Sequence, residues 1–117
     1  MLLHLLSTIG EDYTLSLWEY GLDDSYDAWS PEIFQTIQQS AKGNKIAQFE
    51  SCKKVTLALK NKNVKAVEIV HTKKPDYVIT YQWIWHGNLL QVVYVNKGTY
   101  GTESPKGENV LKTIQLY

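Results

Sequence analysis

Residues 77–96 read YVITYQWIWHGNLLQVVYVN, the clearest β-sheet pattern in the chain. Apolar and polar side chains alternate on both sides of Gly87-Asn88, which is the period of a β-strand. A glycine and an asparagine between two such runs are typical of a two-residue hairpin turn. The stretch therefore predicts two antiparallel strands, at residues 77–86 and 89–96.

The expected turn also assigns residues to the two faces of the sheet, because successive side chains of a strand point to opposite sides. Residues 64–71 alternate in the same way, so they predict a third strand, which turns into the next one at residues 73–76. We expect the face rich in aromatic residues to pack on helices, and the mixed face to be half exposed or covered by the N-terminal segment. The predicted cross-strand pairs on the aromatic face are Trp85–Leu90, Trp83–Val92 and Tyr81–Tyr94.

Two helices are expected before these strands. Ser30 suits an N-cap and Pro31 suits the first helical position, where a missing N–H has no cost. The first helix would end near Gly43, and its apolar stripe is Ile33, Phe34, Ile37 and Ala41. The second helix is expected over residues 45–60, with Phe49, Cys52, Val55 and Leu59 along one face.

The two ends of the chain allow more than one secondary structure. Residues 2–8 and 13–20 suit a β-hairpin that turns at residues 10–12, although a short helix at residues 2–9 is an alternative. A glycine-rich loop at 97–108 precedes a possible last strand at 110–117. The expected fold class is α+β, with two helices on one face of an antiparallel sheet of four to six strands, in the order β(β)-α-α-β-β-β-β. Residues 1–117 form a single domain in this prediction.

Composition and charge restrict the function further. The chain has one cysteine, Cys52, and no apolar run near the ~20 residues of a membrane helix, so we expect a cytoplasmic protein that does not enter membranes. Residues 1–41 hold seven acids and no lysine, whereas residues 42–117 hold five acids and all twelve lysines. Such asymmetry indicates two different binding faces, or two halves that attract each other. The absence of arginine argues against sequence-specific DNA recognition.

The acidic half is concentrated in residues 18–32, WEYGLDDSYDAWSPE. We call residues 21–29, which connect an expected strand to an expected helix, the acidic loop; Glu19 precedes it at the end of the strand. Its carboxylates would steer a basic partner, and its rings would provide buried contacts. The predicted contact residues are Glu19, Asp23, Asp24, Tyr26, Asp27 and Trp29.

This kind of surface is similar to that of small immunity proteins, antitoxins and phage-encoded nuclease inhibitors. We therefore expect a bacterial or phage protein that is not an enzyme and that neutralises a basic partner, such as a nuclease-like toxin or a host defence protein. No cofactor or metal is expected. The calcium-like spacing of Asp23, Ser25 and Asp27 lacks both the required glycine and the bidentate glutamate that follow in such loops.

Two alternatives come from other classes of protein. The order of helices and sheet resembles that of small microbial ribonucleases, and Glu68 is expected beside Tyr81 on the aromatic face, so it is either a structural carboxylate or a general base. His71 and His86 are expected on the opposite face, at strand ends far apart. A nucleic-acid-binding module is the other alternative, and it would use the lysines at positions 60, 62, 65, 73 and 74.

Overall fold

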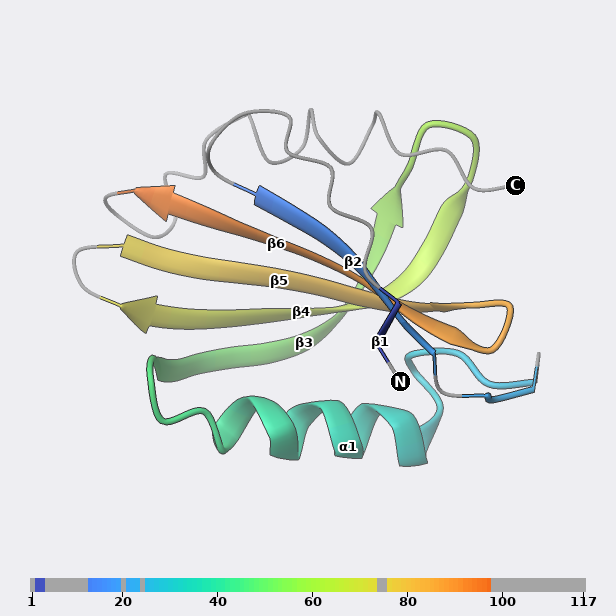
Figure 1. Cartoon of the computed structure of the whole chain (residues 1–117), viewed down its shortest axis with the longest axis horizontal. Helices are drawn as coiled ribbons and strands as arrows, with labels where there is room; N and C mark the ends of the chain where they lie inside the picture. Colours follow the sequence, from blue (N-terminus) through green and yellow to red (C-terminus); the bar gives the residue numbers. More distant parts are fainter. Residues whose placement is uncertain (1, 4–12, 20, 24, 74–75, 98–117) are drawn as a thin grey trace.

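The structure is a computed structural model, and it describes residues 2–3, 13–19, 21–23, 25–73 and 76–97. This part of the chain forms one antiparallel sheet and one helix, so the α+β class is confirmed with one helix in place of two (Figure 1). The elements are β1 (Leu2–Leu3), β2 (Tyr13–Glu19), α1 (Pro31–Lys42), β3 (Gln48–Ala58), β4 (Asn63–Lys73), β5 (Asp76–Trp85) and β6 (Asn88–Lys97).

The six described strands are ordered β1-β2-β6-β5-β4-β3 across the sheet. β1 pairs with β2, as expected for an N-terminal hairpin, although the predicted turn at residues 10–12 lies outside the described residues. β2 pairs edge to edge with β6, so it widens the sheet instead of covering its mixed face. The predicted glycine-rich loop, apart from Lys97, and the predicted last strand at 110–117 also lie outside the described residues.

The β5–β6 hairpin is confirmed, but its turn lies one residue earlier than predicted. Trp85 pairs with Asn88, so the two turn residues are His86 and Gly87. Both have positive φ, at 50° and 75°, which is the backbone that matches the twist of a tight hairpin. The predicted partners are therefore wrong by two positions, and Trp83 faces Leu90 instead of Val92. A shift of two leaves every side chain on its predicted face.

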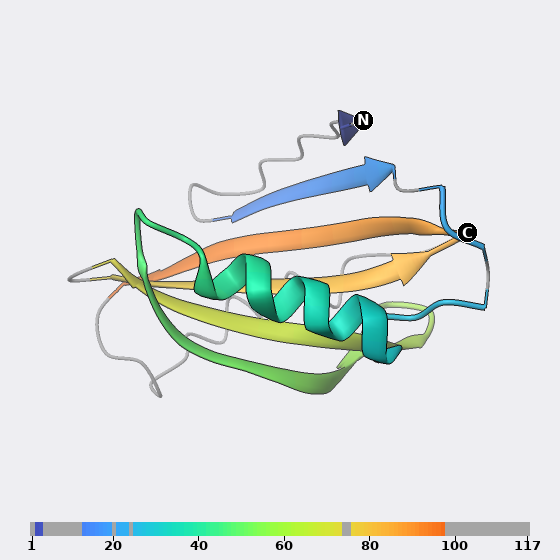
Figure 2. The same ribbon diagram turned by 90° about the horizontal axis from the view of Figure 1, so that it is seen from below.

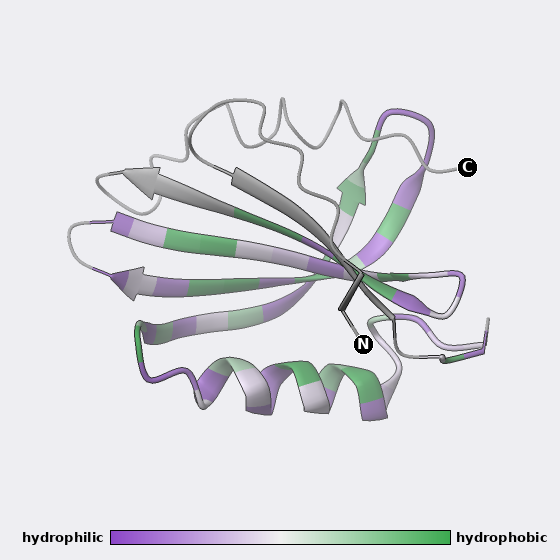
Figure 3. Cartoon of the chain, viewed as in Figure 1, coloured by the Kyte–Doolittle hydropathy of each residue, from purple (hydrophilic) through white to green (hydrophobic). Residues whose placement is uncertain are grey.

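The predicted second helix at residues 45–60 is wrong, because most of this segment forms strand β3. Val55, Leu57 and Leu59 alternate with polar or small residues, and this period of two is the one that the fold uses. β3 pairs along its length with β4, with an irregularity between Phe49 and Ser51. The hydrophilic turn that joins the two strands is purple in Figure 3. Strand pairing with β4 therefore outweighs a helical stripe of the same apolar residues.

Helix α1 starts and ends as predicted, at Pro31 and Lys42. The Ser30 side chain does not cap the helix; its Oγ accepts a hydrogen bond from the backbone N–H of Asp27 at 3.1 Å. Ile37 and Ala41 of the predicted stripe are buried, and they pack with Val67 and Ile69 of β4.

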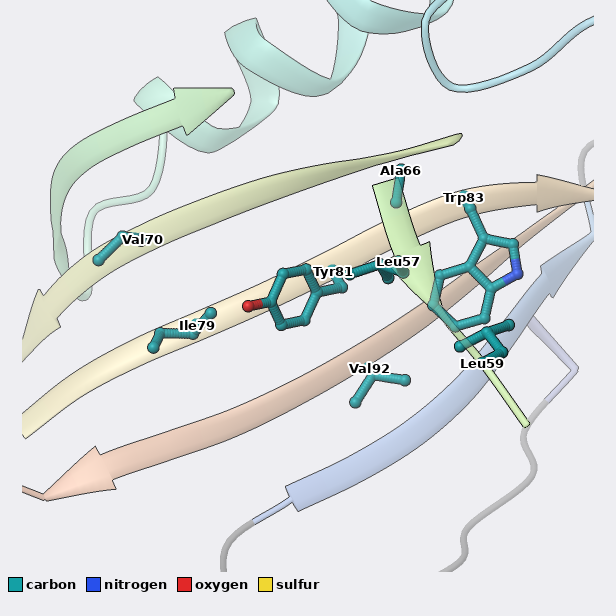
Figure 4. Packing of buried hydrophobic residues seen from close by; sticks show 8 residues of the cluster. All are labelled: Leu57, Leu59, Ala66, Val70, Ile79, Tyr81, Trp83 and Val92. Atoms are coloured by element: carbon teal, nitrogen blue, oxygen red, sulfur yellow. The ribbon is translucent and has the colours of Figure 1, made fainter. Parts of the chain in front are cut away.

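The helix covers the opposite face of the sheet from the one predicted. Its apolar cluster includes Val67 and Ile69, whereas Trp83 and Tyr81 belong to a second cluster with residues of β3, β4 and β6 (Figure 4). We call the first face the helix side and the second the aromatic side. Trp83 is completely buried on the aromatic side, as expected. Leu57 and Leu59 from the end of the β3–β4 hairpin pack with Trp83 there.

The β3–β4 hairpin separates from β5 near its tip. The β4–β5 pairing starts at Val67–Gln82, yet β4 continues for four more residues, from Ala66 back to Asn63, that pair only with β3 among the described residues. Strongly twisted sheets part in this way when a hairpin curls over one face. Because β5 does not continue alongside Ala66, the backbone of Ala66 can form a hydrogen bond with another segment on that side.

Candidate functional site

The acidic loop is attached to the sheet where it leaves β2. The backbone N–H of Leu22 donates a hydrogen bond to the carbonyl oxygen of Gly87 at 3.0 Å, next to the β5–β6 turn. The approach is so close that a Cβ on Gly87 would lie 1.8 Å from the Leu22 carbonyl oxygen. Glycine at position 87 is thus required both by the positive φ of the turn and by the contact with the loop.

A second attachment uses the two residues nearest the helix. Trp29 donates from its indole Nε1 to the carbonyl oxygen of Ala66 at 2.7 Å, which is the backbone group that the parting of β4 and β5 leaves available. Asp27 Oδ1 accepts from the backbone N–H of Trp29 at 2.7 Å, and Asp27 Oδ2 lies 3.8 Å from Lys65 Nζ. The Lys65 ammonium also lies 5.5 Å from the centre of the Trp29 ring. Asp27 and Trp29 therefore hold the loop to the β3–β4 hairpin.

Between these attachments the loop presents Asp23 to solvent. Asp23 Oδ1 accepts hydrogen bonds from both the hydroxyl and the backbone N–H of Ser25, the latter at 2.9 Å. These hydrogen bonds, the hydroxyl's first, lower the pKa of the Asp23 carboxyl below its ordinary value. Tyr26, which follows, is half-buried, and its backbone N–H donates to the carbonyl oxygen of Asp23 at 3.3 Å.

The predicted contact residues thus lie on one connected segment of the chain. The structure does not describe two of them fully. Glu19 ends β2 opposite Asn88, but its side chain lies outside the description, and so does the whole of Asp24. Asp23, Tyr26, Asp27 and Trp29 are placed, and the last two also have internal partners. Among the described residues, no group of three histidine, cysteine, aspartate or glutamate side chains is arranged to hold a metal ion.

Glu68 lies where the sequence predicted, opposite Tyr81 on the aromatic side. The Tyr81 hydroxyl donates to Glu68 Oε2 at 2.9 Å, and Lys53 Nζ lies 3.3 Å from Glu68 Oε1. Glu68 is only 6% exposed; its Oε2 accepts a hydrogen bond, whereas its Oε1 has the ion pair with Lys53 but no hydrogen bond within the described part of the chain. This arrangement accounts for Glu68 as a structural ion pair.

The histidines do not approach Glu68. His71 is on the helix side and His86 is exposed in the β5–β6 turn. His71 lies near the end of β4, as expected, but it is buried there: it is 6% exposed and its Nε2 lies 2.8 Å from the carbonyl oxygen of Ala41. A carbonyl oxygen only accepts hydrogen bonds, so Nε2 carries the proton in this contact. His71 thus joins the end of α1 to β4.

Several exposed lysines of the β3–β4 hairpin and its turn lie over aromatic rings. Lys54 Nζ is 5.0 Å from the centre of the Phe34 ring, and Lys62 Nζ is 4.4 Å from the centre of a ring of Trp85. These are cation–π distances. Lys53 and Lys65 also have partners, so much of the positive charge of the hairpin is in contact with rings or carboxylates. Cys52 is half-buried on the helix side, where burial raises the pKa of its thiol.

Sequence reasoning missed a cavity of about 430 Å³ between α1 and the sheet. Its floor includes Thr80 and Gln82 from β5 and Gln91 from β6, and its wall includes Ile37 and Ala41 from α1. The signal was present as polar residues on a face that otherwise carries valine and isoleucine. Without the position of α1, those residues indicate only a partly exposed strand face.

The described residues include no helix that is long and apolar enough to cross a membrane. A scan against protein-family models gave no match, and neither did a search of curated proteins.

Proposed function

We propose that this protein is a small binding protein that inhibits a basic protein partner, such as a nuclease-like toxin, through the acidic loop. The observation that carries the proposal is the attachment of the loop on both sides of its exposed carboxylate. Leu22 is bonded to the β5–β6 turn and Trp29 to β4, and Asp23 lies between them. An acidic surface with a fixed backbone loses little conformational entropy when a partner binds.

The charges of the loop favour a cationic partner. Asp23 is exposed and its lowered pKa keeps it ionised, while Glu19 and Asp24 add two further acids to the same segment. Exposed carboxylates accelerate association with a positively charged protein because they act over distances of about 10 Å at ordinary ionic strength. A nuclease is such a protein, since it must attract phosphates with its own lysines and arginines.

Tyr26 is the residue that best suits the role of a buried anchor. It is half-buried in the free protein, so part of its ring remains to be covered by a partner. Tyrosine is enriched among the residues that dominate interface energies. Trp29 was predicted for the same role, but its indole N–H and its ring already contact Ala66 and Lys65. A substitution of Trp29 would therefore change folding and binding together, whereas Tyr26→Ala tests binding more directly.

The proposal is tested by affinity capture with three forms of the protein. The wild type is compared with Asp23→Asn/Asp24→Asn and with Glu50→Gln, which removes one charge at the other end of α1. Glu50 is exposed, and glutamine retains an oxygen that can accept the hydrogen bond from the Thr72 hydroxyl. Captured proteins are identified by mass spectrometry at low and at high salt.

The expected result is a basic protein that the wild type and Glu50→Gln capture at low salt and that the double variant loses. The captured protein, if it is a nuclease, should also lose activity on mixing with the wild type. Capture of the same proteins by all three forms, or of no basic protein, would contradict the proposal.

A further inference from the structure

The cavity beside α1 is a second site, separate from the acidic loop. The loop precedes the N-terminus of α1, whereas the cavity uses the second half of the helix and the residues after it, from Ile37 to Ala47. Figure 2 shows α1 lying across one face of the sheet, with β2 and β6 to one side of it. Ile37 and Ala41 pack on Val67 and Ile69 of β4, which leaves the floor over β5 and β6 less completely covered. A volume of about 430 Å³ is within the usual range for small-molecule sites.

Two glutamines form a hydrogen-bonding edge on the floor of this cavity. Gln82 and Gln91 are directly opposite each other in the β5–β6 pairing, and Gln82 Nε2 donates to Gln91 Oε1 at 2.5 Å. One bond between two amides leaves Gln82 Oε1 as an acceptor and Gln91 Nε2 as a donor. Exchanging the two amide orientations would swap these roles but would still leave one donor and one acceptor. The hydroxyl of Thr80, which is only 8% exposed, adds a third polar group to the lining.

The charges around the cavity favour an uncharged ligand. Among the described residues that line it there is no aspartate or glutamate, and the one lysine, Lys73, is exposed and would repel a cation. The last carbonyl groups of α1 lie at the same end, and the negative end of a helix dipole disfavours an anion. The carbonyl oxygen of Ala41 already accepts the hydrogen bond from His71.

Apolar surface adjoins the glutamine edge on two sides. The next pair of residues along the floor on the same face is Ile84 and Leu89. These line a second cavity of about 230 Å³, which shares Ile37 with the first and which Leu22 of the acidic loop also lines. At the other side, Ile46 lines the first cavity although its side chain is 79% exposed. Asn44 Oδ1 fixes this position by accepting from the backbone N–H of Ile46 at 2.8 Å.

We propose that this cavity binds a small uncharged molecule that carries a carboxamide or lactam group on an apolar body. The N–H and C=O of the amide would pair with the free acceptor and donor of Gln82 and Gln91. The apolar body would cover Ile46 or enter the cavity lined by Ile84 and Leu89. Such a molecule matches the hydrogen-bonding pattern, the absence of acids and the apolar neighbours of the edge.

The test uses three probes of nearly the same shape: hydrocinnamamide, its N,N-dimethyl derivative and hydrocinnamate. Binding is measured by NMR titration, which also reports the side-chain amide resonances of Gln82 and Gln91. Hydrocinnamamide should bind saturably and shift both amides. The dimethyl derivative lacks the N–H and hydrocinnamate is an anion, so each should bind about tenfold more weakly, as expected when a donor–acceptor pair is lost.

Variants complete the test. Gln82→Met/Gln91→Met should weaken the binding of hydrocinnamamide about tenfold, and Gln35→Met on the exposed part of α1 should leave it unchanged. Ile46→Ser replaces an exposed side chain, so it should fold normally and bind about threefold more weakly. Equal binding of the three probes, unchanged binding by both cavity variants, or no saturable binding of hydrocinnamamide up to its solubility limit would overturn the proposal.

Discussion

Individual residues explain why acids and rings gather in one short stretch. Trp29 satisfies a backbone carbonyl that the parting strands leave available, and Asp27 accepts the N–H of Trp29. Asp23 remains exposed. The presence of these residues on one loop could be predicted from the sequence, because a helix start at Ser30 and Pro31 fixes where the loop ends. The partner of Trp29 could not be predicted, since it depends on where the β4–β5 pairing stops.

Trp83 provides the sharpest residue-scale prediction of stability. It is completely buried, so Trp83→Ala should lower the free energy of unfolding by about 3–5 kcal/mol. Trp85→Ala, at a half-buried neighbour on the same face, should cost less. Urea denaturation measures both, with an unchanged slope as the check on two-state behaviour. A loss below about 1 kcal/mol for Trp83→Ala would show that the assignment of faces is wrong.

Asp23 gives a prediction about pH. Its pKa is lowered from 3.8 by the Ser25 hydrogen bonds, so folding favours the ionised form. The associated stabilisation is fully present above pH 3.8 and is lost as the pH falls through the lower folded value. Ser25→Ala should raise the pKa of Asp23 towards its ordinary value, whereas Ser40→Ala on α1 should not. NMR titration of the Asp23 carboxyl decides this, and an unchanged pKa in Ser25→Ala would contradict the assigned cause.

Single elements show where sequence patterns succeed and fail. The strands β4, β5 and β6 were predicted because their alternation persists and their turns carry clear signals. The strand β3 was mistaken for a helix, because Phe49, Cys52 and Val55 also follow a helical spacing. Pairing with β4 favours the strand over the helix, because β4 has an edge that β3 can join. Local periodicity does not reveal pairing between different segments of the chain. For the same reason the side of the sheet covered by α1, and hence the cavity, could not be predicted.

The contact between the β5–β6 turn and the acidic loop gives a prediction at the scale of elements. Gly87→Ala would place a Cβ 1.8 Å from the Leu22 carbonyl oxygen, so the loop must move away from the turn. Gly21→Ala is a matched control, because Gly21 also has positive φ but, apart from its chain neighbours, no atom of the described residues lies within 4 Å of the added Cβ.

Gly21→Ala should cost about 1–2 kcal/mol from its backbone conformation alone. Gly87→Ala should cost clearly more, and it should increase the exchange rate of the Leu22 amide hydrogen. Thermal denaturation and hydrogen exchange measure the two effects. Equal costs for the two substitutions, with an unchanged Leu22 amide, would show that the loop is not held by the turn.

The whole molecule combines an acidic N-terminal half with a lysine-rich remainder. Part of this asymmetry is neutralised internally, through Lys65 with Asp27, Lys53 with Glu68, and the lysines that lie over aromatic rings. Asp23 is an exposed acid of the acidic loop, next to Leu22, which is bonded to the β5–β6 turn. The end of β2, that turn and the start of α1 lie at the same end of the molecule (Figure 1). The proposed inhibitory surface is therefore one region of the molecule, and the amide-binding cavity lies along α1 beyond it.

Binding of a basic protein by the acidic loop should be visible in the rate at which the two proteins associate. Association of the captured partner is measured by stopped flow at several ionic strengths, for the wild type, Asp23→Asn/Asp24→Asn and Glu50→Gln. The double variant should associate about tenfold more slowly at low salt and with a flatter salt dependence, while Glu50→Gln should match the wild type. Identical rates and identical salt dependence for all three forms would contradict binding through the acidic loop.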